Sequence, residues 1–134
     1  MKLQHYSDVP SQAVEMEGAS DVVVRWLVSE GDGAPNFAMR QFELAPGGHT
    51  PKHSHPYEHE IYVLEGEGVV LDGDQQRPLT PGDVVFVEPN DVHQFQNTGR
   101  SVLKMLCLIP NSAKNMPVTM APECGVEPAK TSAK

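Results

Sequence analysis

A chain of 134 residues is the size of one domain and is long enough to bury an apolar core without disulfide bonds. The formal net charge of −8 comes from scattered acidic residues, and the lysines and arginines form no basic block, so we expect no nucleic-acid partner, because a phosphate backbone needs a basic surface. The sequence shows neither a signal-peptide pattern nor an apolar run long enough to span a bilayer, so we expect a cytoplasmic protein with no membrane partner.

Strand patterns dominate the chain. Short apolar or β-branched runs alternate with turn clusters rich in Gly, Pro, Asn and Asp, at spacings of about 8 to 12 residues. In chain order the runs are residues 22–28, 37–44, 61–64, 69–71, 84–87 and 102–109. No segment sustains a helical period. This rhythm predicts an all-β domain, built as a sandwich, a jelly roll or a closed barrel.

The two ends of the chain differ from this middle. The N-terminal portion contains one good strand, which could pair with a sheet edge of a partner subunit. Residues 111–134 show no periodic apolar face, so we expect a single domain over residues 1–110 and a flexible C-terminal extension. Cys107 lies in an apolar run and Cys124 in the polar extension, which fits a reducing compartment better than a disulfide framework.

Four of the six histidines lie in two short stretches, with His53, His55 and His59 in the first and His93 in the second. A lone histidine is usually a surface residue, but two histidines one residue apart on a strand point to the same face. In a barrel, His93 can come from a strand that is close in space. Imidazole nitrogens suit Mn, Fe, Co, Ni, Cu or Zn, whereas Ca and Mg need mainly oxygen ligands. The cluster predicts a site for one divalent transition metal.

Two linked motifs resemble those of the cupin family. The segment PGGHTPKHSHPYEHEIYVLEG resembles the first cupin motif, and PGDVVFVEPNDVHQFQN resembles the second, with Gly82, His93 and Asn97 at its Gly, His and Asn. Two motifs in the correct order are more specific than either alone. The resemblance covers about residues 37–109 and implies a cupin double-stranded β-helix, which is a jelly-roll barrel.

The resemblance leaves two neighbours as candidates for the fourth ligand. Counting back from Gly66, the usual glutamate position falls on His59, which makes the chain similar to the four-histidine manganese cupins. Counting forward from His55, Glu60 also fits the permitted gap, so Glu60 is the alternative ligand. The resemblance implies Mn(II), with Fe(II), Ni(II) or Zn(II) as alternatives. Asn90 stands at a usual glycine and can adopt the left-handed backbone that such a turn needs.

Weaker candidates for the wall of a substrate pocket lie on strands that a cupin barrel would place around the metal. These candidates are Phe95, Met39, Met105, Cys107, His49 and Arg40. Sulfur-bearing and aromatic residues on such strands are more often plain core. His49 and Arg40 could contact an anionic substrate or a metal-bound water, although a surface position is the simpler expectation for Arg40. We interpret Trp26 and Tyr62 as packing residues.

The resemblance implies a metal-dependent protein that binds a small molecule. Four ligands leave two positions of an octahedral ion open, which favours a catalytic over a purely structural metal. On this resemblance we expect a homodimeric oxidoreductase of dioxygenase or oxidative-cleavage type that acts on a small organic molecule. Two alternatives stay open, because cupins host many activities. One is a metal-dependent isomerase or lyase that needs no O₂, and the other is a non-catalytic cupin that binds a metal or small ligand.

Overall fold

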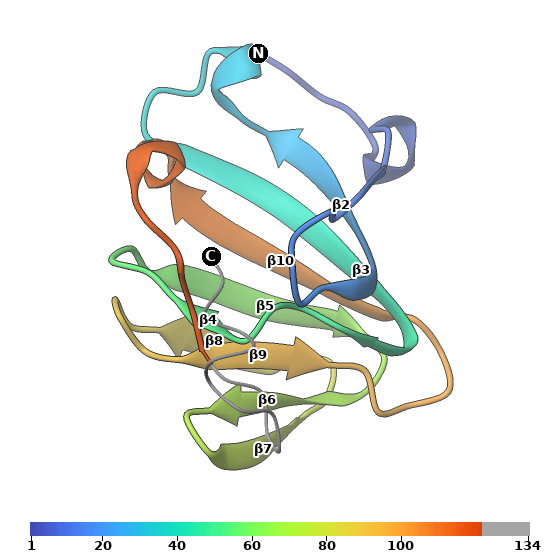
Figure 1. The fold of residues 1–134 in the computed structure, drawn as a ribbon. Helices are drawn as coiled ribbons and strands as arrows, with labels where there is room; N and C mark the ends of the chain where they lie inside the picture. The colour runs from blue at the N-terminus through green and yellow to red at the C-terminus, as the bar shows by residue number, and fades with distance from the viewer. Residues whose placement is uncertain (122–134) are drawn as a thin grey trace.

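The computed structural model describes residues 1–121, which form short strands and a few 3-10 turns (Figure 1). The strands are β1 (Gln12–Ala13), β2 (Ser20–Val28), β3 (Phe37–His49), β4 (His53–Ser54), β5 (His59–Glu65), β6 (Gly68–Asp72), β7 (Gln75–Leu79), β8 (Val84–Val87), β9 (His93–Gln96), β10 (Leu103–Pro110) and β11 (Thr119–Met120). The 3-10 turns are η1 (Tyr6–Asp8), η2 (Glu30–Asp32) and η3 (Asn111–Asn115). Each predicted run overlaps a strand, so the all-β prediction is confirmed. No helix within this part of the chain is long and apolar enough to cross a membrane.

The strands form one curled antiparallel sheet. In one half, β3 pairs with β2 and with β10, β10 pairs with β5, and β5 pairs with β8. In the other half, β9 pairs with β4 and β6, and β6 forms a hairpin with β7. The halves are joined where the end of β3 pairs with β9 through His49 and Gln96. Figure 1 shows β2, β3 and β10 at the top and β6 and β7 at the bottom, with the other paired strands between them, and this closure encloses a common interior.

The apolar core lies between the two halves, and β10 shows how the sequence selects it. Its side chains alternate between buried and partly exposed positions, as expected of a strand with one face turned inward. Burial of one large aliphatic side chain stabilises the fold by about 1.5–3 kcal/mol. The buried cluster consists of Val22, Ala38, Leu44, Ile61, Val63, Val70, Leu79, Val87, Phe95, Leu103, Met105, Cys107, Ile109 and Ala113.

Two turns place the motif segments relative to each other. Gly66, between β5 and β6, has a φ of 88°, and a Cβ atom there would overlap the Val102 carbonyl, so a larger residue would be strained. Asn90 has a φ of 71°, which agrees with the left-handed turn predicted for it. The Asn90 N–H donates to the His55 carbonyl oxygen at 2.7 Å. This bond ties the first histidine stretch to the loop that precedes His93.

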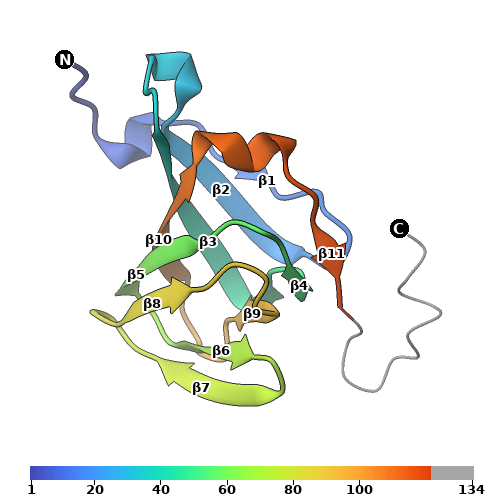
Figure 2. The same cartoon turned by 90° about the vertical axis from the view of Figure 1, so that its left-hand side faces the viewer.

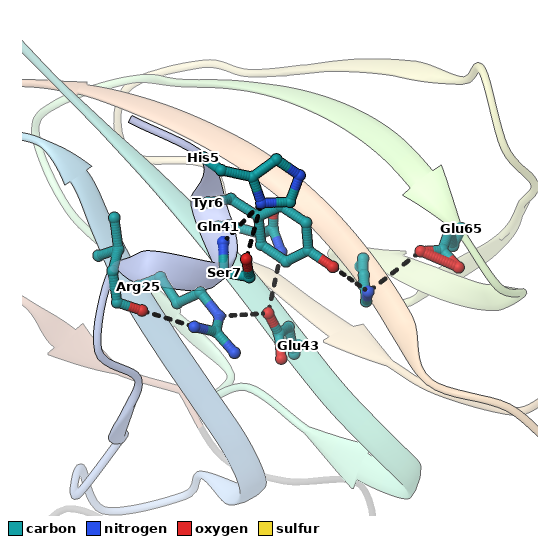
Figure 3. Close-up of polar contacts among 9 residues, drawn as sticks. His5, Tyr6, Ser7, Arg25, Gln41, Glu43 and Glu65 are labelled. Atoms are coloured by element: carbon teal, nitrogen blue, oxygen red, sulfur yellow. Dashed lines mark hydrogen bonds and ion pairs between the residues drawn. The ribbon is translucent and has the colours of Figure 1, made fainter. Parts of the chain in front are cut away.

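The N-terminal segment lies against the outer face of the sheet through polar contacts (Figure 3). On neighbouring strands, Arg25 Nε and Gln41 Nε2 both donate to Glu43 Oε2, at 2.8 and 2.9 Å. Lys104 Nζ donates to the Tyr6 hydroxyl at 3.2 Å and also pairs with a Glu65 carboxylate oxygen at 3.1 Å. Strand β1 pairs with β2 of the same chain. Pairing of this segment with a partner subunit stays a prediction.

The first part of the C-terminal extension is structured. Residues 111–121, which we expected to be flexible, contain η3 and the short strand β11, and β11 pairs with β4 beside the first histidine stretch (Figure 2). Backbone hydrogen bonds fix this segment even though it has no periodic apolar face, since strand pairing does not depend on side-chain pattern. The remainder of the extension, including Cys124, lies outside the described residues.

The ion pair on the outer face gives a pH-dependent contribution to stability. Burial raises the pKa of Glu43, but hydrogen bonds from Arg25 and Gln41 outweigh it and hold this pKa below the ordinary value of 4.5. A carboxylate with a lowered folded pKa stabilises the fold above its unfolded pKa and loses that contribution as the pH falls through the folded value. Glu43→Gln should therefore cost about 1–3 kcal/mol of unfolding free energy at pH 7.

Urea unfolding at pH 7 and pH 3 measures this effect. The variant should lose less stability than wild type on acidification, because the carboxylate that titrates is gone. Asp74→Asn, at an exposed turn position, is the matched control and should behave as wild type. Parallel acid sensitivity in wild type and Glu43→Gln would contradict this account.

Candidate metal centre

Three strand starts bring the four candidate ligands together. His53 lies on β4, opposite His93 at the start of β9, and His55 follows β4 before the turn. His59 begins β5, whose buried positions alternate, so its ring points inward with Ile61. Because alternate side chains of β5 point inward and β4 pairs with β9, the four imidazoles are directed into the same space.

The four imidazoles converge closely. One nitrogen from each of His53, His55, His59 and His93 lies within 4.8 Å of the others. The ring centroids of His55 and His59 are 4.6 Å apart, and those of His53 and His93 are 4.8 Å apart. His55, His59 and His93 retain only 2%, 7% and 4% of their exposed surface. Such concentrated, buried imidazole is unusual unless it serves a common ligand.

The outward nitrogens of three rings have fixed partners. His55 Nδ1 lies 2.8 Å from the Tyr57 carbonyl oxygen, and His93 Nδ1 lies 2.8 Å from the Asp91 carbonyl oxygen. His59 Nδ1 lies 3.2 Å from the Cys107 sulfur. A carbonyl can only accept, so Nδ1 carries the hydrogen in the first two rings and Nε2 keeps its lone pair. This is the arrangement in which outer contacts orient metal-binding histidines.

The inward nitrogens test whether an ion fits. His55 Nε2 and His59 Nε2 face each other at 3.0 Å, and within residues 1–121 the buried His93 Nε2 and His53 Nδ1 have no hydrogen-bond partner. Buried lone pairs without partners are costly, and a shared cation would satisfy them. Two nitrogens that each bind one ion at about 2.1 Å lie about 3.0 Å apart when the nitrogen–metal–nitrogen angle is roughly 90°. The group can therefore hold a metal ion, and its all-nitrogen donors suit a transition metal.

Burial keeps the imidazoles neutral, which metal binding requires. It lowers the pKa of His53 to about 3 and that of His55 to about 4, with neighbouring histidines and the Arg40 charge adding to the effect. Burial also lowers the pKa of His59 and of His93. All four side chains are therefore uncharged at neutral pH, and their lone pairs are available to a cation without prior loss of a proton.

The alternative ligand, Glu60, lies on the other side of its strand. Consecutive strand residues point to opposite faces, and Glu60 is exposed where His59 is buried. The Glu58 carboxyl, which is hydrogen-bonded to Glu60, raises the pKa of Glu60 to about 7, with burial as a smaller cause. The structure thus groups His59, and not Glu60, with the other three histidines.

A cavity of about 270 Å³ opens over the histidines. Of the four candidate ligands, His53, His59 and His93 line it. The candidate wall residues that also line this cavity are Phe95, Met105, Cys107 and Arg40. Most of the remaining wall is apolar, so this is a pocket in which a small organic molecule can lie next to the histidines.

Two candidate pocket residues lie elsewhere. Met39 pairs with Leu108, whereas Arg40 pairs with Cys107, so the side-chain alternation of β3 turns Met39 away from the barrel and into a separate surface depression. His49 is not among the cavity residues, and its Nδ1 lies 3.4 Å from Gln94 Nε2. Gln94 alternates with His93 and Phe95 along β9, so His49 packs behind that strand.

Aromatic residues that the sequence analysis did not assign to the pocket complete it. The Tyr57 ring stacks on His55 with centroids 3.7 Å apart and planes within 8°, and it lines the cavity with Phe42 and Trp26. The interpretation of Trp26 as a packing residue was incomplete, since it is 39% exposed and borders the pocket. Tyr62 is exposed on the outer face of β5. The spacing of Tyr57 between two histidines was the available signal for its position.

The family comparison agrees with this geometry. A family model described as a cupin domain matches residues 40–109. This chain belongs to the cupin family. The resemblance to small cupins with grouped histidines and the predicted cupin barrel are thereby confirmed.

Similar proteins carry different functions. An oxalate-binding protein of Thermotoga maritima is 39% identical over 70 residues, which cover 52% of this chain and 58% of that protein. A 1-methylthio-D-xylulose 5-phosphate methylsulfurylase of Rhodospirillum rubrum is 30% identical over 95 residues, which cover 71% of this chain and 60% of that protein. The chain therefore spans less than two thirds of these relatives. Among solved structures, the polyketide cyclase RemF from Streptomyces resistomycificus has a TM-score of 0.85 and 33% identity, covering 90% of this chain and 85% of that one.

Single-residue variants test the ligand set of this cupin. His59→Ala removes one inward nitrogen and should lower metal affinity at least about 100-fold. Glu60→Ala removes an exposed carboxylate and should leave the metal content unchanged. Elemental analysis of both purified variants beside wild type gives the measurement. Loss of metal in the glutamate variant alone would show that Glu60, and not His59, is the fourth ligand.

The contact between His59 and Cys107 predicts a further effect on metal affinity. Cys107→Ala leaves the outward nitrogen of His59 without its partner, so the ring loses its orientation and metal affinity should fall about 10-fold to 100-fold. Ile109→Val changes the same face of β10 without removing a polar group and serves as the control. Competition with a chromogenic chelator measures both affinities. Equal affinities in wild type and Cys107→Ala would show that the thiol has no orienting role.

Proposed function

We propose that this cupin is an enzyme that uses a metal ion held by His53, His55, His59 and His93 to act on a small organic molecule. The observation that carries the proposal is the position of the histidines, which lie at the wall of a largely apolar cavity of about 270 Å³. A purely structural metal needs no such cavity beside it. We propose Mn(II) as the metal, with Fe(II), Ni(II) or Zn(II) as alternatives, because neutral nitrogen donors suit all four.

The residues around the histidines define what the site can do. A bound divalent ion with four neutral ligands would act as a Lewis acid toward a carbonyl or enol oxygen. Phe42, Phe95 and Met105 supply apolar surface that excludes water. Burial raises the pKa of Tyr57, so its phenol stays protonated and can donate a hydrogen bond to a substrate oxygen in the cavity.

The proposed reaction is a rearrangement, cyclisation or elimination that needs no O₂. The similarity to a polyketide cyclase over 90% of the chain supports it. The pocket wall also contains Met105 and Cys107, and the Cys107 sulfur lies 3.2 Å from a candidate ligand. Thioether and thiol groups in this position would be exposed to any oxidant formed at the ion. The oxidative reaction expected from the sequence stays a prediction, and the experiment below separates the two.

Self-association is part of the same proposal. Tyr62 on β5 and Val84 and Phe86 on β8 are 46%, 73% and 58% exposed, and they share the outer face of adjacent strands. An exposed apolar group at a sheet edge suits a contact with a second copy, which supports the predicted homodimer. The cytoplasmic location likewise stays a prediction.

Anaerobic turnover tests the proposed reaction. Protein loaded with Mn(II), Fe(II) or Zn(II) is incubated with a panel of enolisable aromatic ketones and β-keto acids, with and without O₂, and products are identified by mass spectrometry. We expect a product that is isomeric with the substrate, or that differs by loss of water or CO₂, formed equally without O₂. His93→Ala should reduce the rate at least about 100-fold, and His5→Ala, at an exposed N-terminal position, should not.

The other outcomes are equally clear. Incorporation of oxygen into the product would replace this reaction by the oxidative one. A protein that binds metal and panel compounds without converting any of them would support a non-catalytic binding role. Absence of bound metal in the wild-type protein would contradict the proposal as a whole.

A further inference from the structure

Arg40 stands out among the residues of the cavity. Its guanidinium carbon lies 4.7 Å from the centroid of the Phe42 ring and 5.4 Å from that of Trp26. The Nη2 group donates to the Cys107 sulfur at 3.1 Å. Contact with two aromatic faces holds the planar guanidinium in place at the cavity wall. An arginine on an open surface would be free to move.

Most hydrogen-bond donors of Arg40 are free for a ligand. A guanidinium has five N–H donors, and the contact with Cys107 uses one of them. The buried Nε has no hydrogen-bond partner anywhere in residues 1–121. A buried donor without an acceptor costs about 1–3 kcal/mol, so this position is unfavourable unless something occupies the cavity.

The charge of Arg40 is also uncompensated. Arg25, on the outer face, pairs with Glu43 at 2.8 Å, whereas no ion pair found in the described part of the chain includes Arg40. An imidazole is either neutral or cationic, so the four histidines do not offset the charge, and an ion bound to them would add to it. The cavity is therefore positive in a chain whose formal net charge is −8, and it favours an anion.

We propose that Arg40 binds the carboxylate of a flat organic acid whose apolar body lies against Phe42, Phe95 and Met105. The planar fork of a guanidinium can hold both oxygens of a carboxylate, which gives orientation as well as affinity. An organic acid is then the substrate class of the function proposed above. The binding of the carboxylate by Arg40 rests on that function only in placing the rest of the substrate beside the ion. Arg40 thereby sets which end of the molecule faces the histidines.

Equilibrium binding of two probes of equal shape tests this role separately from turnover. Benzoate carries the carboxylate and benzamide is its neutral counterpart, and each is titrated by calorimetry into metal-free and Zn(II)-loaded protein. Wild type should bind benzoate at least about tenfold more tightly than benzamide in both forms. Arg40→Met keeps the aliphatic stem and should weaken benzoate binding about 10-fold to 100-fold while changing benzamide binding less than about twofold.

Two further variants make the test decisive. Arg77→Gln, at an exposed position outside the cavity, should bind both probes as wild type does. Arg40→Lys keeps the charge but loses the fork and should weaken benzoate binding about threefold to tenfold. If Arg40→Met does not fold, Arg40→Lys decides the question. Metal content is measured for each variant, so a lost metal site is distinguished from a lost anion site.

Several results would overturn the inference. Equal weakening of benzoate and benzamide in Arg40→Met would make Arg40 a packing residue. A preference for benzoate that survives in Arg40→Met would place the carboxylate on the metal ion alone. Wild-type protein that binds neither probe, or both equally, would show that the cavity does not select organic anions, whatever the outcome of the turnover assay.

Discussion

The structure of this cupin depends on the burial of four imidazole rings whose free nitrogens face one another. Neutral buried nitrogens that lack hydrogen-bond donors are unfavourable, and the facing nitrogens of His55 and His59, 3.0 Å apart, repel each other when neither is protonated. A shared cation turns this local cost into a source of stability, since the fold and the ion are then thermodynamically linked. The barrel supplies the packing that holds the rings together until an ion binds.

That packing comes from elements far apart in the sequence. The backbone bond from Asn90 to His55 joins the two histidine stretches, and Cys107 of β10 contacts His59 of β5. Two of the outward nitrogens meet carbonyl oxygens of their own loops. Three of the four rings, those of His55, His59 and His93, are thus held from behind by a group outside the set of four histidines. Disturbing any one of these contacts is expected to act on the ion through ring orientation.

The cavity combines two kinds of surface with different tasks. Aromatic and sulfur-bearing side chains give it an apolar lining, which strengthens electrostatic interactions by excluding water. Arg40 contributes a fixed cation on the same wall, linked through Cys107 to His59. The candidate ligands and the proposed anion site are therefore connected by a single sulfur atom. A molecule that neutralises Arg40 would also change the electrostatic environment of the histidines.

The sequence by itself determined the six apolar strands β2, β3, β5, β6, β8 and β10, the spacing of the four histidines and the left-handed turn at Asn90, because these depend on local pattern and backbone preference. Only the tertiary structure decided which residues of β3 face the cavity. The pairing of Arg40 with Cys107 turns Arg40 inward and Met39 outward, and a shift of one residue would have exchanged them. The pairing of β11 with β4 was equally hidden, since backbone hydrogen bonds between distant segments leave no periodic signal in the side chains.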